Sequence, residues 1–129
     1  MALRSRSAGH RSFRYRTTKR LMLSAYRQMW ALVMFDLPVG SADERKAATG
    51  FRLVLLDLGF EMVQFSVYAR YCTSPQRTET LVRQVEEALP TDGAVDILFF
   101  TDKQYENVKH FRGKQRLPAT KTPTQFDLF

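Results

Sequence analysis

The sequence predicts one α+β domain, in which two helices pack against one face of an antiparallel sheet. Three observations indicate this fold class: an apolar run at 30–35, two amphipathic segments that begin at Ser41 and Ser74, and strand-like segments at 60–72 and 94–101. The chain has 129 residues, of which 44% are hydrophobic and 12% aromatic. This size and composition suit one modest core and are not typical of a disordered chain.

The first predicted strand ends on an acidic residue. Large apolar side chains fill residues 30–35, as in a buried strand, and Asp36 follows them. Pro38 then ends the strand, because proline has no N–H to pair. A carboxylate at the end of a buried strand can meet a metal ion or a phosphodiester on a rigid scaffold. The alternative is that Asp36 only caps the turn that follows.

The segment after Pro38 predicts a helix. Ser41 and Glu44 have the spacing of a capping box, and Gly59 is well placed to end the helix. Between these signals, apolar residues recur at the intervals of a helix that lies on a sheet. This stripe consists of Ala47, Ala48, Phe51, Val54, Leu55 and Leu58.

Two further segments have the composition of strands. Residues 60–72 are rich in β-branched and aromatic side chains, and a bend near 64–66 would divide them into two shorter strands. Residues 94–101 follow the turn signal at 91–93 and form another apolar strand.

A second helix is predicted between these strands. It begins at Ser74, with Pro75 in the first turn, where proline is tolerated, and it ends before Pro90. Its buried stripe comprises Leu81, Val82, Val85, Ala88 and Leu89.

The order of these elements is that of a ferredoxin-like βαββαβ sandwich. The sheet face opposite the helices keeps large apolar side chains, so we expect a second copy to cover it in a symmetric homodimer. We predict a flexible basic arm at 1–21, a ferredoxin-like domain at 22–105, and a linker with a C-terminal strand at 106–129. Residues 125–129 alternate apolar and polar side chains, which suits pairing with a sheet edge.

The positive charge is confined to one part of the chain. Of the 20 basic residues, seven lie within 1–21, and the other 13 equal the 13 acidic residues in number, so the arm accounts for the net charge of +7. The arm is interpreted in three ways: as a phosphate-binding extension, as a transit peptide, or as sequence upstream of a start at Met22 or Met29.

Several classes of protein are excluded by composition. Cys72 is the only cysteine, which excludes an internal disulfide and a thiolate metal cluster and favours a reducing, cytoplasmic setting. His10 and His110 lie far apart and have no metal-ligand spacing. The longest apolar run is far short of the roughly 20 residues that cross a bilayer, so no membrane span is expected.

Several segments together resemble a known family. They are MWALVMFDLP, ADERKAATGFR, GFEMVQFSVYAR, LPTDGAVDILFFTDKQY and the tail QFDLF. In this order they resemble the small CRISPR-associated protein family numbered two, over Met22 to Phe129. That family is the partner subunit of the CRISPR spacer integrase, the family numbered one. Because residues 1–21 lie outside the resemblance, we favour the interpretation of the arm as upstream sequence.

The resemblance implies a ferredoxin-like homodimer that bridges two integrase dimers and holds a double-stranded fragment of foreign DNA during spacer acquisition in a prokaryote. Many members are also described as Mg²⁺-dependent endonucleases that act on single-stranded RNA or on DNA. The resemblance implies that Asp36 is the metal ligand and the catalytic residue. The family often has a basic residue just before its Q-[FY]-S-V segment, where this chain has Met62. We therefore favour the scaffold as the essential function, with a stand-alone, toxin-like, metal-dependent endoribonuclease as the alternative.

Candidate binding residues follow from their positions. Cations on the first helix, at the end of a strand and after the last core strand are expected to contact the DNA backbone, without base specificity: Arg45, Lys46, Arg52, Arg70 and Lys103. The tail is expected to bind the integrase or to close the sheet of the dimer mate, through Gln125, Phe126, Leu128 and Phe129. A ferredoxin-like RNA-binding module is disfavoured, because the strands lack its Gly-rich aromatic signature.

Overall fold

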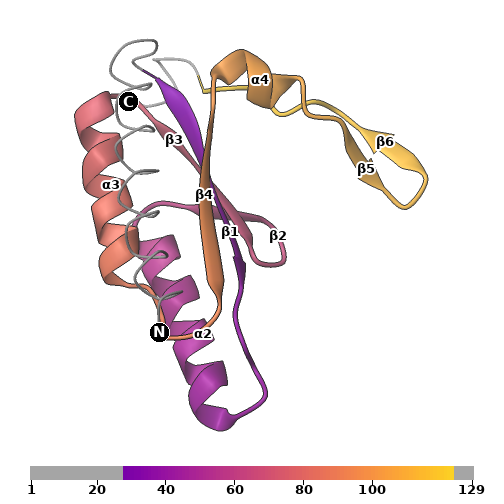
Figure 1. Cartoon of the computed structure of the whole chain (residues 1–129). Coiled ribbons are helices and arrows are strands. Elements are labelled where there is room, and N and C mark those ends of the chain that lie inside the picture. The colour runs from indigo at the N-terminus through magenta and orange to yellow at the C-terminus, as the bar shows by residue number, and fades with distance from the viewer. Residues whose placement is uncertain (1–27, 124–129) are drawn as a thin grey trace, which may run out of the picture.

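The computed structural model describes residues 28–123, and its main body is a four-stranded sheet with two helices on one face (Figure 1). The basic arm and residues 124–129 of the expected tail lie outside the described residues. The strands are arranged in the order β2-β3-β1-β4, and every neighbouring pair is antiparallel. This order is the ferredoxin-like arrangement that the sequence predicts. The elements are β1 (Met29–Asp36), α2 (Ala42–Asp57), β2 (Glu61–Gln64), β3 (Val67–Cys72), α3 (Pro75–Glu87), β4 (Ala94–Phe100), α4 (Asp102–Glu106), β5 (His110–Arg112) and β6 (Gln115–Leu117).

Both long helices begin at the predicted residues. Ser41 and Glu44 form the complete capping box of α2, in which the Ser41 hydroxyl accepts from the Glu44 N–H and the Glu44 carboxylate accepts from the Ser41 N–H. Ser74 caps α3 in the same way by accepting from the Arg77 N–H, and Pro75 occupies the first turn. These side chains satisfy N–H groups that have no partner within a helix. Local sequence therefore fixes where the two helices start.

The bend expected within residues 60–72 is a tight turn between β2 and β3. Ser66 has a φ of 61°, a left-handed conformation that is uncommon outside glycine, and its carbonyl accepts from the Phe35 N–H at 3.0 Å. The β2–β3 turn is thereby joined to the end of β1. Phe65, in the same turn, is 91% exposed.

The core lies between the sheet and the two long helices. Ala31 and Val33 of β1 alternate toward the helices and are buried, as are Phe51 and Leu55 of α2. Val85 of α3 is also buried in this cluster. β1 pairs with β3 as far as Met34 and with β4 as far as Asp36, so its Asp36 end is held in the sheet by β4.

Residues 28–123 cover the other face of the sheet only at one end. Trp30 of β1 stacks on Tyr105 of α4, with ring centroids 4.2 Å apart and an interplanar angle of 17°. Toward the far end of β1, Met34 is 39% exposed and Asp36 is exposed. The described chain therefore leaves the Asp36 end of this face without a covering layer. We call the whole sheet face opposite the two long helices the outer face.

The region after the core differs from the expected strand and linker. The last core strand ends at Phe100, because Thr101 caps α4 in a second capping box with Gln104. Within the expected linker, β5 and β6 pair as a hairpin that projects from the body (Figure 1). These strands have three residues each, too few for alternation to identify them in the sequence.

Candidate functional site

Asp36 is the last residue of β1 and lies on the outer face. It is opposite Ala94 of β4, and its side chain shares a face with Met34 because alternate residues of a strand point the same way. Gly93 packs against it closely: a Cβ on Gly93 would lie 2.6 Å from the Asp36 carbonyl oxygen. The backbone that carries this carboxylate is therefore fixed by the sheet and by the turn before β4.

A second carboxylate, which the sequence analysis did not identify, shares this face. Asp96 of β4 is opposite Met34, so it is the diagonal neighbour of Asp36 on the adjacent strand. Such diagonal neighbours have a spacing of about 7–8 Å, and both acids are exposed. The signal in the sequence is a single acid at an alternate position of an otherwise apolar strand, in Ala94–Phe100.

The two carboxylates on this face suit a weakly held Mg²⁺ ion. They do not suit a metal centre that protein ligands enclose on all sides. Among the described residues, no group of three or more His, Cys, Asp or Glu side chains could hold a metal. Mg²⁺ commonly uses one or two carboxylates and completes its shell with waters and substrate phosphates. Asp36 and Asp96 fit that requirement only as an open, exposed site.

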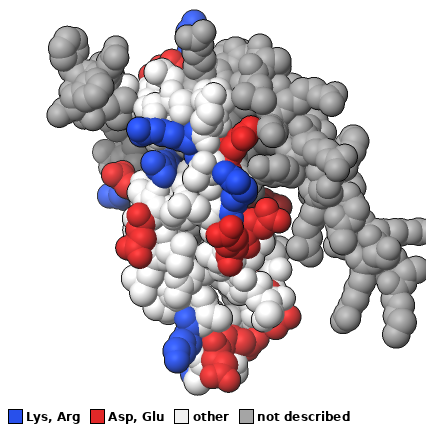
Figure 2. All heavy atoms as spheres, turned by 90° about the vertical axis from the view of Figure 1, so that its left-hand side faces the viewer, with Lys and Arg blue, Asp and Glu red and all other residues white. Residues whose placement is uncertain are grey.

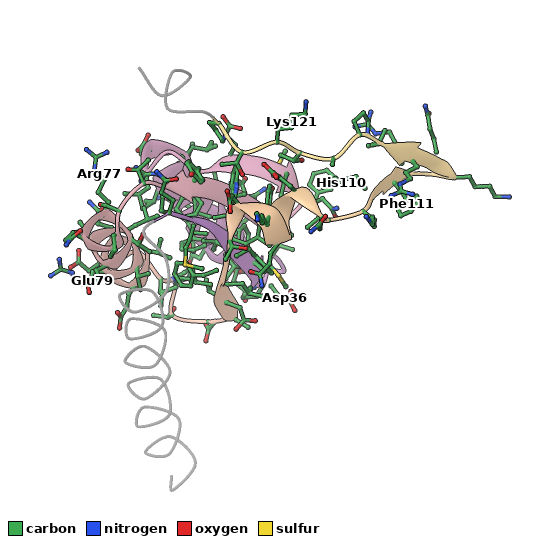
Figure 3. All side chains as sticks on the ribbon, turned by 90° about the horizontal axis from the view of Figure 1, so that it is seen from above. Asp36, Arg77, Glu79, His110, Phe111 and Lys121 are labelled. Atoms are coloured by element: carbon green, nitrogen blue, oxygen red, sulfur yellow. The ribbon has the colours of Figure 1, made fainter. Side chains whose placement is uncertain are left out.

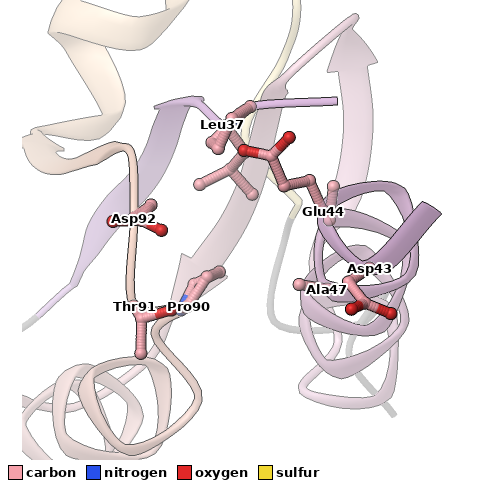
Figure 4. A pocket seen from close by; sticks show the side chains of 9 residues that line it. Leu37, Asp43, Glu44, Ala47, Pro90, Thr91 and Asp92 are labelled. Carbon is pink, nitrogen blue, oxygen red and sulfur yellow. The ribbon is translucent and has the colours of Figure 1, made fainter. Parts of the chain in front are cut away.

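A small pocket of about 170 Å³ lies beside the start of α2 (Figure 4). It is bounded by the β1–α2 loop, the first turns of α2 and the turn before β4, and Asp43, Glu44 and Asp92 carry its charge. The Glu44 carboxylate accepts from the Ser41 N–H, so the capping box already engages it. Asp43 lies in the first helical turn, where a negative charge complements the helix dipole.

Three of the five candidate DNA-binding cations lie on α2. Arg45 is exposed and donates to the Val39 carbonyl at 3.2 Å, and Lys46 beside it is exposed. Arg52 is half-buried and donates from Nε to the Ala48 carbonyl at 3.4 Å. Figure 2 shows acidic and basic side chains interspersed on the helix side of the molecule, so residues 28–123 form no continuous positive surface in this view.

The other two candidates lie elsewhere. Arg70 lies within β3 and not at its end, and its guanidinium donates to the carbonyl of Leu58, the residue that ends α2. Lys103 is exposed on α4, at the opposite end of the sheet from the start of α2 (Figure 1). Within one chain, the structure does not bring the five cations onto a single surface.

Burial affects the ionisable groups of the core. Burial raises the pKa of the Cys72 thiol, which is therefore poorly suited to act as a nucleophile. Burial, with a smaller contribution from the Glu61 carboxylate, raises the pKa of Tyr105.

The partner-binding candidates Gln125, Phe126, Leu128 and Phe129 lie outside the described residues.

Fold and site together define a class: a ferredoxin-like α+β protein with an exposed carboxylate at the end of its central strand and an open outer sheet face. Comparison with known proteins supplies the family. The family model of CRISPR associated protein Cas2 matches residues 29–108, and the chain belongs to this family.

Individual relatives agree with this assignment. The chain is 63% identical over 108 residues to the CRISPR-associated endoribonuclease Cas2 of Paracidovorax avenae, a match that covers 84% of this chain and 100% of that protein. It is 41% identical over 107 residues to the protein of the same description from Flavobacterium psychrophilum, which covers 83% and 93% of the two chains. A crystal structure of Cas2 has a TM-score of 0.50 and 15% identity, covers 75% of this chain and 99% of its own, and confirms the fold. No helix among residues 28–123 is long and apolar enough to cross a membrane.

Proposed function

We propose that the protein is the adaptation subunit of a prokaryotic CRISPR system, acting in the cytoplasm as a symmetric homodimer that bridges two integrase dimers and holds foreign double-stranded DNA. Membership of the Cas2 family is consistent with this function. The observation that carries the proposal is the outer face of the sheet, where apolar side chains and Asp36 lie without a covering layer from residues 28–123.

A homodimer accounts for this face. Leu32 of β1 and Leu98 of β4 are opposite each other there, and Met34 follows them toward the exposed end. Exposed apolar surface of this kind usually marks an interface, and a two-fold axis lets the same residues cover each other. Face-to-face packing would bring the two Asp36 carboxylates toward each other across the axis.

Dimer symmetry would also double the cations available for DNA. Duplex DNA carries one phosphate charge per about 1.7 Å of axis, so a few cations on each chain are enough to follow it. Arg45, Lys46 and Arg52 of α2, with Lys103 of α4, supply such cations. The C-terminal segment 125–129 would pair with the integrase or with the dimer mate.

Reconstituted spacer integration with the cognate integrase tests the proposal. We compare the full chain with Asp36→Ala and with a chain truncated after Pro123. The scaffold function predicts that Asp36→Ala integrates DNA like the wild type, whereas the truncated chain does not. If Asp36→Ala fails although it dimerises and binds the integrase, a metal-bound Asp36 is central, and the scaffold proposal is wrong.

A second candidate function is a Mg²⁺-dependent endoribonuclease, stand-alone and toxin-like. It is supported by the two carboxylates, Asp36 and Asp96, on one exposed face, and by the endoribonuclease description of the relatives. Asp36 and Asp96 would hold the ion, with a phosphate of single-stranded RNA or of DNA completing its coordination. Bound Mg²⁺ supplies electrostatic stabilisation at the phosphate and lowers the pKa of a coordinated water.

Cleavage of a labelled single-stranded RNA tests the second function. The wild type should cleave in Mg²⁺ and stop on addition of a chelator, and Asp36→Asn should abolish cleavage. Asp96→Asn should weaken cleavage if Asp96 shares the ion. Equal cleavage by wild type and Asp36→Asn would show that a contaminating nuclease is responsible and would exclude this function.

A further inference from the structure

The β5–β6 hairpin and its flanks, which together span residues 107–123, form the most basic part of the described chain. It carries Lys109, Arg112, Lys114, Arg116 and Lys121 and no acidic residue. The family model ends at residue 108, so nearly all of the hairpin lies beyond it. A segment of five positive charges without a carboxylate attracts polyanions.

The base of the hairpin is anchored to the body. The chain leaves from α4, where Tyr105 is buried beneath Trp30, and returns at Thr122. There the Trp30 Nε1–H donates to the Thr122 hydroxyl at 3.0 Å, and the Thr122 N–H donates to the Glu106 carboxylate at 3.1 Å. Both ends are thus held at one point of the sheet.

The hairpin itself is a regular two-stranded ribbon. His110 is opposite Leu117 and Arg112 is opposite Gln115, with a two-residue loop between the strands. Gly113, first in that loop, has a φ of 59°, as the tight primed turns of hairpins require. The ribbon therefore presents its side chains in a fixed alternation, away from Asp36 (Figure 3).

One face of the ribbon pairs an aromatic ring with a guanidinium. Phe111 and Arg116 are directly opposite each other, so their side chains point the same way. Phe111 is 63% exposed, and Arg116 is exposed. An exposed ring beside an exposed guanidinium offers a stacking surface next to a positive charge.

We propose that this Phe111–Arg116 face binds single-stranded nucleic acid, with Phe111 stacking on an unpaired base and with Arg116 and the loop residue Lys114 contacting phosphates. The combination of a stacking ring and a basic track is how proteins bind single strands without sequence preference. A blunt duplex offers the same phosphates but exposes a base face only at its two ends, so the exposed ring favours the single strand. The inference rests on the proposed DNA-holding function, to which it adds the site for unpaired ends of the captured fragment.

Fluorescence anisotropy with the full chain tests this proposal. The probes are a labelled 20-nucleotide DNA strand, an RNA strand of the same sequence, and a blunt DNA duplex. Phe111→Ala should weaken binding to the DNA strand about five- to a hundredfold, the range expected for one lost stacking contact, and should leave the duplex affinity and the salt dependence unchanged. Lys114→Gln/Arg116→Gln should lower the slope of log K against log salt by about 1.4 for a single strand.

Matched variants separate the hairpin from general effects. Phe65→Ala removes another exposed ring, and Arg77→Gln/Arg83→Gln removes two exposed charges from α3. These variants should bind the DNA strand within about twofold of the wild type, because their positions lie far from the ribbon. Equal losses in the hairpin and control variants would overturn the proposal.

Light scattering at the same protein concentration covers the competing explanation that Phe111 is a dimer contact. If Phe111→Ala loses affinity only at concentrations at which it has become monomeric, the ring serves dimerisation and the proposal is wrong. Weaker binding by a variant that is as dimeric as the wild type supports it.

The probes also separate this inference from the proposed function. If the wild type binds the duplex but the hairpin variants bind the DNA strand as tightly as the wild type does, DNA holding remains intact and only the hairpin site is refuted. Failure of the wild type to bind any probe would refute both. Preference for the RNA strand over the DNA strand would identify the bound strand as RNA and support the second candidate function.

Discussion

Replacing Gly93 by alanine tests how the Asp36 end of β1 is held. Gly93 has a φ of 98°, and an added Cβ would lie 2.6 Å from the Asp36 carbonyl oxygen and 2.8 Å from Leu37 Cδ2. The strained backbone costs roughly 1–2 kcal/mol for a residue with a Cβ. Overpacking against neighbours that cannot move freely costs about 1–3 kcal/mol more. We therefore expect Gly93→Ala to lower the free energy of unfolding by about 2–5 kcal/mol.

Substitutions at two other glycines separate the cost of backbone strain from the cost of overpacking. Gly113 has a φ of 59° but open space around its Cβ position, so Gly113→Ala carries the backbone strain alone and should cost about 1–2 kcal/mol. Gly50 lies within α2 with nothing within 4 Å of the added Cβ. Gly50→Ala should therefore stabilise the protein by about 0.5–1 kcal/mol.

Urea unfolding measures all three variants. Trp30 is the only tryptophan, and it stacks on Tyr105, so its fluorescence reports on the sheet and on α4 together. With an m-value of about 2 kcal/mol per molar, Gly93→Ala should lower the midpoint by about 1–2.5 M. Protein concentration is kept fixed, because dimerisation would make the midpoint concentration-dependent. A midpoint for Gly93→Ala equal to that of Gly113→Ala would refute the close approach to Asp36.

Two further predictions concern Arg70 and alkaline pH. Arg70→Met should lower the free energy of unfolding by about 1.5–3 kcal/mol, because the Leu58 carbonyl loses a charged donor. Burial, with a smaller contribution from Glu61, raises the pKa of Tyr105 above its usual 10, so the folded state favours the neutral phenol. Its stabilising effect is complete below pH 10 and is lost as the pH rises through the raised pKa, because the unfolded state releases the proton first. Urea midpoints measured from pH 8 to pH 11 should therefore fall above pH 10, and should fall less in Tyr105→Phe.

Each of these has a control. Arg83→Met removes an exposed charge from α3 and should change stability by less than about 0.5 kcal/mol, so an equal effect of Arg70→Met would contradict a structural role for Arg70. Burial also raises the pKa of the Cys72 thiol, which titrates from a usual value of 9.0. The pH series is therefore repeated in Cys72→Ala. If the urea midpoint of Cys72→Ala falls above pH 10 by the same amount with and without Tyr105→Phe, the second prediction is contradicted.

Local patterns in the sequence determined most of the ferredoxin-like body. The capping box at Ser41 and the cap at Ser74 fixed the helix starts, because each cap depends on residues only three positions apart. Continuous apolar runs identified β1 and β4, and the bend near Ser66 divided β2 from β3. The family followed from the same segments, and the match over residues 29–108 confirms it.

Only the tertiary structure decided which side chains share a surface. Asp96 is 60 positions from Asp36 in the sequence, yet strand pairing places it diagonally beside Asp36 on the outer face. Arg70 was expected at a strand end, whereas its position in β3 directs it to the Leu58 carbonyl. The hairpin was expected as a linker, and its anchor joins Trp30 to Thr122, 92 positions apart. Caps and periodicity act between near neighbours and are legible in the sequence, whereas pairing across the sheet and closure of a loop depend on contacts between distant residues that only the folded chain brings together.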